Sequence, residues 1–185
     1  AGQCELQKYC YEYGIDKTIP NSPNLFEIDD SNPFFQIDPN KCIGCGKCAE
    51  ICRNLQCNHA LKLKTTNGKI HTWVNKADNI NNSTCASCGN CVSFCPTAGL
   101  LQKYKNEFRH WETKMVKTTC GYCGVGCQID FEVKDNTVVA AHPVLVKPNA
   151  GLLCVKGKFG YSFINHPDRL THPLIKENGI FRKAS

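Results

Sequence analysis

Two stretches of the chain alternate between apolar and polar residues and have a turn signal at their centre. Residues 61–74, LKLKTTNGKIHTWV, alternate on both sides of Asn67 and Gly68. Residues 127–144, CQIDFEVKDNTVVAAHPV, alternate on both sides of residues 134–136. Asparagine, aspartate and glycine tolerate the left-handed backbone conformations that tight hairpin turns need. The pattern therefore predicts a β-hairpin in each stretch.

Other segments have weaker patterns. Residues 17–40 contain four prolines, which predict an extended linker between modules. Residues 101–117 read LQKYKNEFRHWETKMVK, and this segment predicts a short connecting helix at 105–117. No apolar run approaches the ~20 residues of a membrane span, and the first residues lack the basic and apolar regions of a signal peptide. We therefore expect a cytoplasmic protein without a membrane span.

Composition indicates that apolar packing alone does not stabilise the chain. Fifteen of its 185 residues are cysteines, and they form part of a hydrophobic fraction of 42%. Small domains with a limited core commonly add disulfides or metals. The formal net charge is +6. We interpret it as compensation for bound anionic clusters, with basic residues scattered along the chain, and nucleic-acid binding is not expected.

Eight cysteines form two runs with the same spacing, C-x2-C-x2-C-x3-C. This spacing is typical of bacterial ferredoxins, in which three cysteines of one run and the fourth of the other hold each cluster. Zinc fits less well because it favours two separated cysteine pairs, and disulfides fit less well because C-x2-C crowding gives poor geometry. We therefore predict two [4Fe-4S] clusters with crossed ligands, namely Cys42, Cys45, Cys48 and Cys95 for the first and Cys85, Cys88, Cys91 and Cys52 for the second.

A third group of cysteines has a different spacing. Cys120, Cys123 and Cys127 lie in the glycine-rich sequence TTCGYCGVGC, and Cys154 follows after 26 intervening residues. The predicted hairpin between them can return the fourth cysteine to the first three. We therefore predict a third [4Fe-4S] cluster on these four residues.

Residues outside the motifs receive simpler interpretations. Cys10 and Cys57 fit none of the three spacings, and we interpret them as small buried or free thiols. His142, His166 and His172 each precede a proline. We interpret these histidines as surface turn residues and not as metal ligands.

The third group and the sequence after it resemble the N-terminal iron–sulfur domain of the molybdopterin oxidoreductases. The similarity lies in CGYCGVGC and in CVKGKFGYSFINHPDRLTHPLI, residues 154–175. Within that family the sequence most resembles formate dehydrogenase, and the two ferredoxin runs resemble the arm of its cytosolic, NAD(P)- or hydrogenase-coupled types. The resemblance implies an α+β fold, with a two-[4Fe-4S] ferredoxin-like domain followed by a small β-rich [4Fe-4S] domain.

The resemblance also implies functional residues and cofactors. Lys156 would lie between the third cluster and a pterin, where it would bind the pterin and assist electron transfer. A molybdenum or tungsten bis(pterin guanine dinucleotide) would bind beyond this sequence and convert formate to CO2. Residues 2–15, GQCELQKYCYEYGI, resemble the end of a His-plus-three-Cys cluster motif. Cys4 would be the last ligand of that fourth cluster, whose other ligands would precede Ala1.

These motifs divide the chain into six parts. They are a truncated cluster module (1–16), the linker (17–40), the ferredoxin-like domain (41–104), the connecting helix (105–117), the third-cluster domain (118–172) and the start of a catalytic domain (173–185). The expected function is an electron relay between a formate active site and a redox partner, either a flavin diaphorase-type or hydrogenase subunit or a ferredoxin.

Two other functions remain as alternatives. A stand-alone polyferredoxin would carry electrons without an attached active site, but it would have no use for residues 155–175. The iron–sulfur subunit of a respiratory NADH dehydrogenase would share the third cysteine group, but we do not expect two full ferredoxin runs in it.

Overall fold

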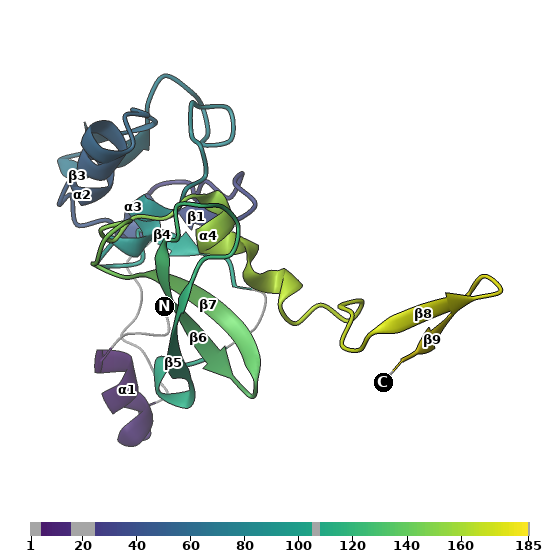
Figure 1. The fold of residues 1–185 in the computed structure, drawn as a ribbon. Helices are drawn as coiled ribbons and strands as arrows, with labels where there is room; N and C mark the ends of the chain where they lie inside the picture. The colour runs from purple at the N-terminus through teal and green to yellow at the C-terminus, as the bar shows by residue number, and fades with distance from the viewer. Residues whose placement is uncertain (1–4, 16–24, 105–107, 185) are drawn as a thin grey trace.

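Short strands, short helices and loops alternate along the chain in the computed structural model, which describes residues 5–15, 25–104 and 108–184 (Figure 1). Nine strands in these residues form four separate antiparallel sheets. The α-helices in the same residues are all short, namely α1 (Glu5–Glu12), α2 (Lys47–Glu50), α3 (Asn90–Ser93) and α4 (Val155–Phe159).

The first two sheets belong to the part of the chain that contains both ferredoxin runs. β1 (Phe35–Ile37) pairs with β4 (Leu100–Gln102), so the segment before the first run is bonded to the segment after the second. β2 (Leu61–Thr66) pairs with β3 (Lys69–Val74) through a turn in which Asn67 and Gly68 have positive φ. This pairing confirms the predicted hairpin at residues 61–74.

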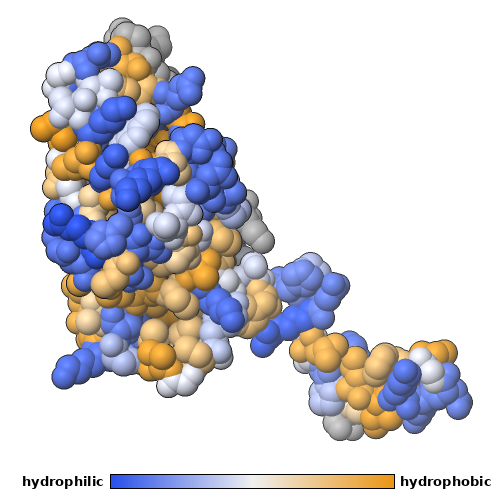
Figure 2. All heavy atoms as spheres, turned by 90° about the horizontal axis from the view of Figure 1, so that it is seen from above, coloured by the Kyte–Doolittle hydropathy of each residue, from blue (hydrophilic) through white to orange (hydrophobic). Residues whose placement is uncertain are grey.

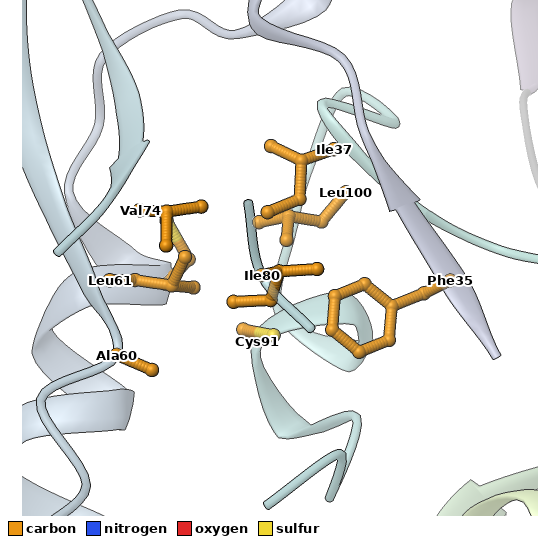
Figure 3. Packing of buried hydrophobic residues seen from close by; sticks show 9 residues of the cluster. Phe35, Ile37, Ala60, Leu61, Val74, Ile80, Cys91 and Leu100 are labelled. Carbon is orange, nitrogen blue, oxygen red and sulfur yellow. The ribbon is translucent and has the colours of Figure 1, made fainter. Parts of the chain in front are cut away.

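The largest core lies between these sheets and the helices that follow the cysteine loops. Figure 3 shows its side chains approaching one another from β1, β4 and the β2–β3 hairpin. Phe35 and Ile37 are almost fully buried, so the predicted linker 17–40 contributes a strand to the ferredoxin-like part. The core consists of Phe35, Ile37, Ala60, Leu61, Val74, Ile80 and Leu100 together with Cys48 and Cys91.

A three-stranded sheet follows in the order β5–β6–β7. β6 (Gln128–Lys134) and β7 (Thr137–Pro143) form the second predicted hairpin, and Asp135 and Asn136 have positive φ at its turn. β5 (Lys114–Thr119) pairs with β6 along its full length.

The prediction of a connecting helix at 105–117 is wrong for the residues of this segment that the structure describes. Residues 110–112 form one 3-10 turn, and residues 114–117 belong to β5. Residues 105–107 lie outside the described part. Pairing of Met115 and Val116 with Glu132 and Phe131 outweighs the helical tendency of the isolated segment, because strand preference depends on the neighbours that a strand finds.

α4 and a following 3-10 helix (Gly160–Phe163) connect the sheet to a thin arm. β8 (Leu174–Glu177) and β9 (Ile180–Lys183) form a hairpin that stands clear of the body (Figures 1 and 2). Both strands are exposed along their whole length, including the apolar side chains of Ile180 and Phe181. Among the described residues, no helix is long and apolar enough to span a membrane.

α1 lies beside the three-stranded sheet, away from the β2–β3 hairpin (Figure 1). The ring of Tyr11 lies 5.8 Å from that of Trp111, and its hydroxyl accepts a hydrogen bond from Arg109. Cys10 on this helix is partly buried. Cys4, the predicted ligand of a fourth cluster, lies outside the described residues.

Candidate metal centres

The two ferredoxin runs form loops with the same backbone conformation. In each loop a glycine with positive φ precedes the helix, namely Gly46 before α2 and Gly89 before α3. Two residues earlier, Gly44 and Ser87 also have positive φ. Their amides donate to the sulfur of the first cysteine in each run, at 3.4 and 3.3 Å. The loops therefore turn N–H groups toward sulfur, and such hydrogen bonds tune iron–sulfur clusters.

The first site combines three cysteines of the first run with the last cysteine of the second. Burial raises the pKa of the Cys48 thiol, and the nearby thiols of Cys42 and Cys95 raise it further. Thr72 on β3 closes the site, because its amide donates to Cys42 Sγ at 3.3 Å and its hydroxyl lies 3.3 Å from Cys48 Sγ. Cys45 on the same loop is exposed, so this site reaches the surface.

The second site lies deeper and combines three cysteines of the second run with the last cysteine of the first. Burial raises the pKa of the Cys91 thiol well above its usual value, and Cys88, Cys85 and Cys52 raise it further. A cavity with mostly apolar walls lies among these four cysteines, between the π-helix at Ile51–Leu55 and the loop before α3. Cys48 of the first site also acts on Cys91, so the first two sites are neighbours.

The third site forms where the β5–β6 loop meets the start of α4. Cys120, Cys123 and Cys127 lie on that loop, which is closed by a 2.8 Å hydrogen bond from the Cys120 amide to the Cys127 carbonyl. Cys154 is the residue before α4. Burial raises the pKa of the Cys127 thiol, and Cys120, Cys123 and Cys154 raise it further. The hairpin thus brings together the four cysteines that the sequence predicted to meet.

The chemistry of these groups suits a cluster better than a single ion. Among the described residues, no three Cys, His, Asp or Glu side chains are arranged to hold one metal ion. A cubane separates its thiolates by four iron and four sulfide atoms, so its ligands need not meet at one point. Clustered buried thiolates are costly without a nearby positive charge, which iron supplies. The residues present therefore fit [4Fe-4S] clusters.

Two contacts join the second site to the third. Asn90, the first residue of α3, is 1% exposed, and its side chain forms two 3.0 Å hydrogen bonds with the backbone of Leu153, the residue before the last third-site cysteine. Phe159 of α4 packs on Gly89, where a Cβ atom would lie 2.5 Å from the ring. Position 89 therefore favours glycine for two reasons: its φ is positive, and a Cβ atom would be too close to Phe159.

Lys156 lies on α4 at the edge of the third site. Its side chain is exposed, and its Nζ lies 5.9 Å from the ring centre of Tyr122. Both residues border a small cavity next to Cys120. The ammonium group is therefore close to the third site and accessible from outside.

Lys158, two residues further along α4, is 3% exposed. Its Nζ donates a 2.9 Å hydrogen bond to the carbonyl of Ala141 on β7. Burial lowers the pKa of Lys158 to about 8, while Glu132 and Cys91 favour its charged form. A buried cation therefore lies between the second site and the three-stranded sheet.

A buried carboxylate in the same sheet accepts hydrogen bonds from three side chains. Glu132 on β6 is 1% exposed. His142 Nε2 lies 2.8 Å from one carboxylate oxygen, and His110 Nδ1 and Thr113 Oγ1 lie 3.0 and 2.8 Å from the other. Burial alone would raise the pKa of Glu132, but the bonds from His142, His110 and Thr113 outweigh it and lower the pKa to about 2. The prediction that His142 is a surface turn residue is therefore wrong.

Sequence analysis did not identify Glu132 or Asn90. Glu132 lies on the same face of β6 as Gln128 and Asp130, and it is buried because His110, Thr113 and His142 gather around its carboxylate. Asn90 owes its position to a contact 63 residues away. Short-range patterns give no signal for either feature.

Two domain families match the chain. Residues 41–99 match the 4Fe-4S dicluster domain, and residues 113–166 match the molybdopterin oxidoreductase Fe4S4 domain. The first match contains both ferredoxin runs, and the second contains the third site with α4. The second match begins at residue 113, next to β5.

Curated relatives align with nearly the whole chain. YjgC of Bacillus subtilis, provisionally named an oxidoreductase, is 33% identical over 99% of this chain and 23% of that protein. The NADPH-Fe(3+) oxidoreductase subunit alpha of Geobacter sulfurreducens is 35% identical over 95% and 21%. A Staphylococcus aureus protein with a provisional formate dehydrogenase name is 29% identical over 99% and 23%. The chain therefore spans about a fifth of the length of these relatives.

Proposed function

Because the chain joins a 4Fe-4S dicluster domain to the Fe4S4 domain of the molybdopterin oxidoreductases, we propose that it relays electrons between a formate/CO2 active site and a redox partner. Iron–sulfur electron transfer is the activity common to both domains. The name of the Staphylococcus aureus relative supports formate as the substrate. The active site, with its molybdenum or tungsten bis(pterin guanine dinucleotide), would be formed by other parts of the full-length protein, in the cytoplasm.

The observation that supports this proposal is that cysteines from distant parts of the sequence lie near one another. Each proposed site draws its fourth cysteine from a distant part of the sequence, as the proximity of Cys52 to Cys85 and of Cys154 to Cys127 illustrates. When bound, a [4Fe-4S] cluster supplies one-electron transfer. The protein's own part is to hold the thiolates, donate N–H groups to their sulfur atoms and exclude water from the second site.

Contacts join the first site to the second and the second to the third. Cys48 and Cys91 connect the first site to the second, and Asn90 and Leu153 connect the second to the third. We propose that the third site, with Lys156 beside it, faces the pterin, and that the first site faces the partner. The partner would be a flavin diaphorase-type or hydrogenase subunit, or a ferredoxin. The redox-subunit name of the Geobacter relative supports a partner of this class.

Metal analysis and EPR of the anaerobically purified full-length protein test the proposal. Three cubanes require about twelve iron and twelve sulfide from these sites, in addition to any that other parts of the protein bind. Iron content should fall by about four atoms when the cysteines of any one site are replaced by alanine. Stoichiometric zinc in place of iron would contradict the proposal.

A further inference from the structure

Lys158 is a buried residue whose backbone and side chain contact two different sites. Its N–H donates a 2.9 Å hydrogen bond to the carbonyl of Cys154, the last cysteine of the third site. Its side chain passes Gly89 in the loop of the second site, where a Cβ atom would lie 2.8 Å from Lys158 Cγ. Lys158 is only 3% exposed. It therefore lies inside the protein, at the junction of the two sites.

The side chain of Lys158 ends at the three-stranded sheet, where its ammonium group donates a 2.9 Å hydrogen bond to the carbonyl of Ala141. A buried ammonium group needs negative charge nearby, because burial alone favours its neutral form. Two anionic groups favour the charged form of Lys158, namely the Glu132 carboxylate and the Cys91 thiolate. The Glu132 oxygens already accept hydrogen bonds from two histidines and a threonine. The second site is therefore an electrostatic partner of this lysine.

The residues around Lys158 and the second site are shielded from water. Cys91 is 9% exposed, and Asn90 beside it is 1% exposed. Phe159, the residue after Lys158, covers Gly89 with its ring. Charges in such surroundings interact more strongly than charges at the surface, where water and salt screen them. A charge at position 158 therefore acts on the second site with little screening.

We infer that the positive charge of Lys158 raises the reduction potential of a [4Fe-4S] cluster bound at the second site. Reduction adds one negative charge to the cluster, so a nearby cation stabilises the reduced form more than the oxidised form. Net charge is one of the factors that set the potential of such a cluster. The inference rests on the proposed function, because the potential matters only if electrons pass through the second site.

Lys158 and Lys156 therefore have different roles. Lys156 is exposed beside the third site, and its proposed role is toward the pterin. Lys158 acts toward the second cluster. Because electrons move toward the higher potential, its charge favours transfer from the third site to the second.

Redox titration of the full-length, cluster-loaded protein at pH 7, followed by EPR, tests this inference. The second-site signal is the one that Cys91→Ala removes. Lys158→Met and Lys158→Gln both remove the charge, and glutamine keeps an N–H donor for the Ala141 carbonyl. In both variants the ratio of reduced to oxidised second cluster at a fixed potential should fall about tenfold, which corresponds to about 59 mV for a one-electron couple.

Two further variants separate the charge of Lys158 from its packing. Lys158→Arg keeps the positive charge and should keep the second-site potential close to that of wild type. The control Lys114→Met removes the same charge from an exposed position of β5, where solvent screens it, and should also leave the potential close to wild type.

Four outcomes would overturn this role of Lys158. They are an unchanged second-site potential in the two neutral variants, an equal shift in Lys114→Met, an equal shift in Lys158→Arg, and loss of the second cluster from both neutral variants, which would make Lys158 a structural residue. The iron content of the wild-type protein separates the two proposals. A wild-type protein without a second-site cluster rejects the relay, whereas full iron with an unchanged potential in the neutral variants rejects the role of Lys158 alone.

Discussion

Asn90 and Leu153 are 63 positions apart and form two hydrogen bonds of 3.0 Å with each other. Asn90 begins α3 and precedes Cys91 of the second site, and Leu153 precedes the last cysteine of the third. Both residues are buried, so water does not replace a lost partner. The amide of Asn90 therefore fixes the position of one candidate metal centre relative to the next.

Replacement of Asn90 by alanine should loosen this junction. The unpaired N–H and C=O of Leu153 should lower the free energy of unfolding by roughly 2–4 kcal/mol. We expect all three sites to keep their iron, while electron transfer from the third site to the second becomes slower. Urea titration and rapid-mixing EPR measure the two effects. Asn81→Ala, at an exposed position, is the matched control, and a similar loss in both variants would argue against a special role for Asn90.

The crossed ligand sets predict an unusual pattern of cluster loss. Cys52→Ala should remove the second cluster, about four iron atoms, and leave the first cluster largely intact although it lies next to Cys52 in sequence. EPR of the reduced protein distinguishes the two clusters. The matched control is Cys57→Ala, which removes an exposed cysteine five residues later. Selective loss of the first cluster in Cys52→Ala would contradict the crossed arrangement.

Lys156 should affect turnover without affecting cluster content. Its ammonium offers three donors beside the third site, and the methionine variant removes them at similar length. In the full-length enzyme, Lys156→Met should slow formate-dependent reduction of the acceptor at least about tenfold, which corresponds to about 1.4 kcal/mol. Lys156→Arg should rescue poorly because guanidinium geometry differs. Lys147→Met, at another exposed position of the same domain, is the control, and wild-type turnover in Lys156→Met would reject the role.

Glu132 should make the stability of the three-stranded sheet depend on pH. Its folded pKa of about 2 lies below its usual value of 4.5, so its contribution is fully present above pH 4.5 and is lost as pH falls toward 2. Glu132→Gln should therefore lower the free energy of unfolding at pH 7 by on the order of 2–3 kcal/mol.

The difference between wild type and Glu132→Gln should shrink as the pH falls from 4.5 to 3. Urea titrations followed by circular dichroism at pH 7, 5 and 3.5 measure it. Glu177→Gln on the exposed arm is the control and should change little. A difference that stays constant over this pH range would show that Glu132 acts through its shape and not through its charge.

The features that sequence predicted are those set by neighbouring residues. Both hairpins were predictable because Asn67–Gly68 and Asp135–Asn136 favour the positive φ values that the structure shows. The two iron–sulfur domains were predictable because cluster loops impose a fixed spacing on the chain, and the domain families match at those spacings.

The features that sequence missed depend on distant partners. β5 forms a strand because β6 lies beside it, and the short apolar sequence at Phe35 becomes a strand because β4 pairs with it. Glu132 is buried because His110 and Thr113, 22 and 19 residues earlier, reach its carboxylate. In each case the deciding contact lies far away in sequence, where local pattern has no influence.

The proposed exchange of cysteines between the two ferredoxin loops would set a limit on biosynthesis. Cys48 has Cys95 as a neighbour, and Cys85 has Cys52. While the chain leaves the ribosome, neither site has all its ligands until the second run has emerged, because residues 53–84 separate the runs. Cluster insertion is then a late step for both sites together, and a gene cut between the runs would encode two halves that cannot each hold a complete cubane.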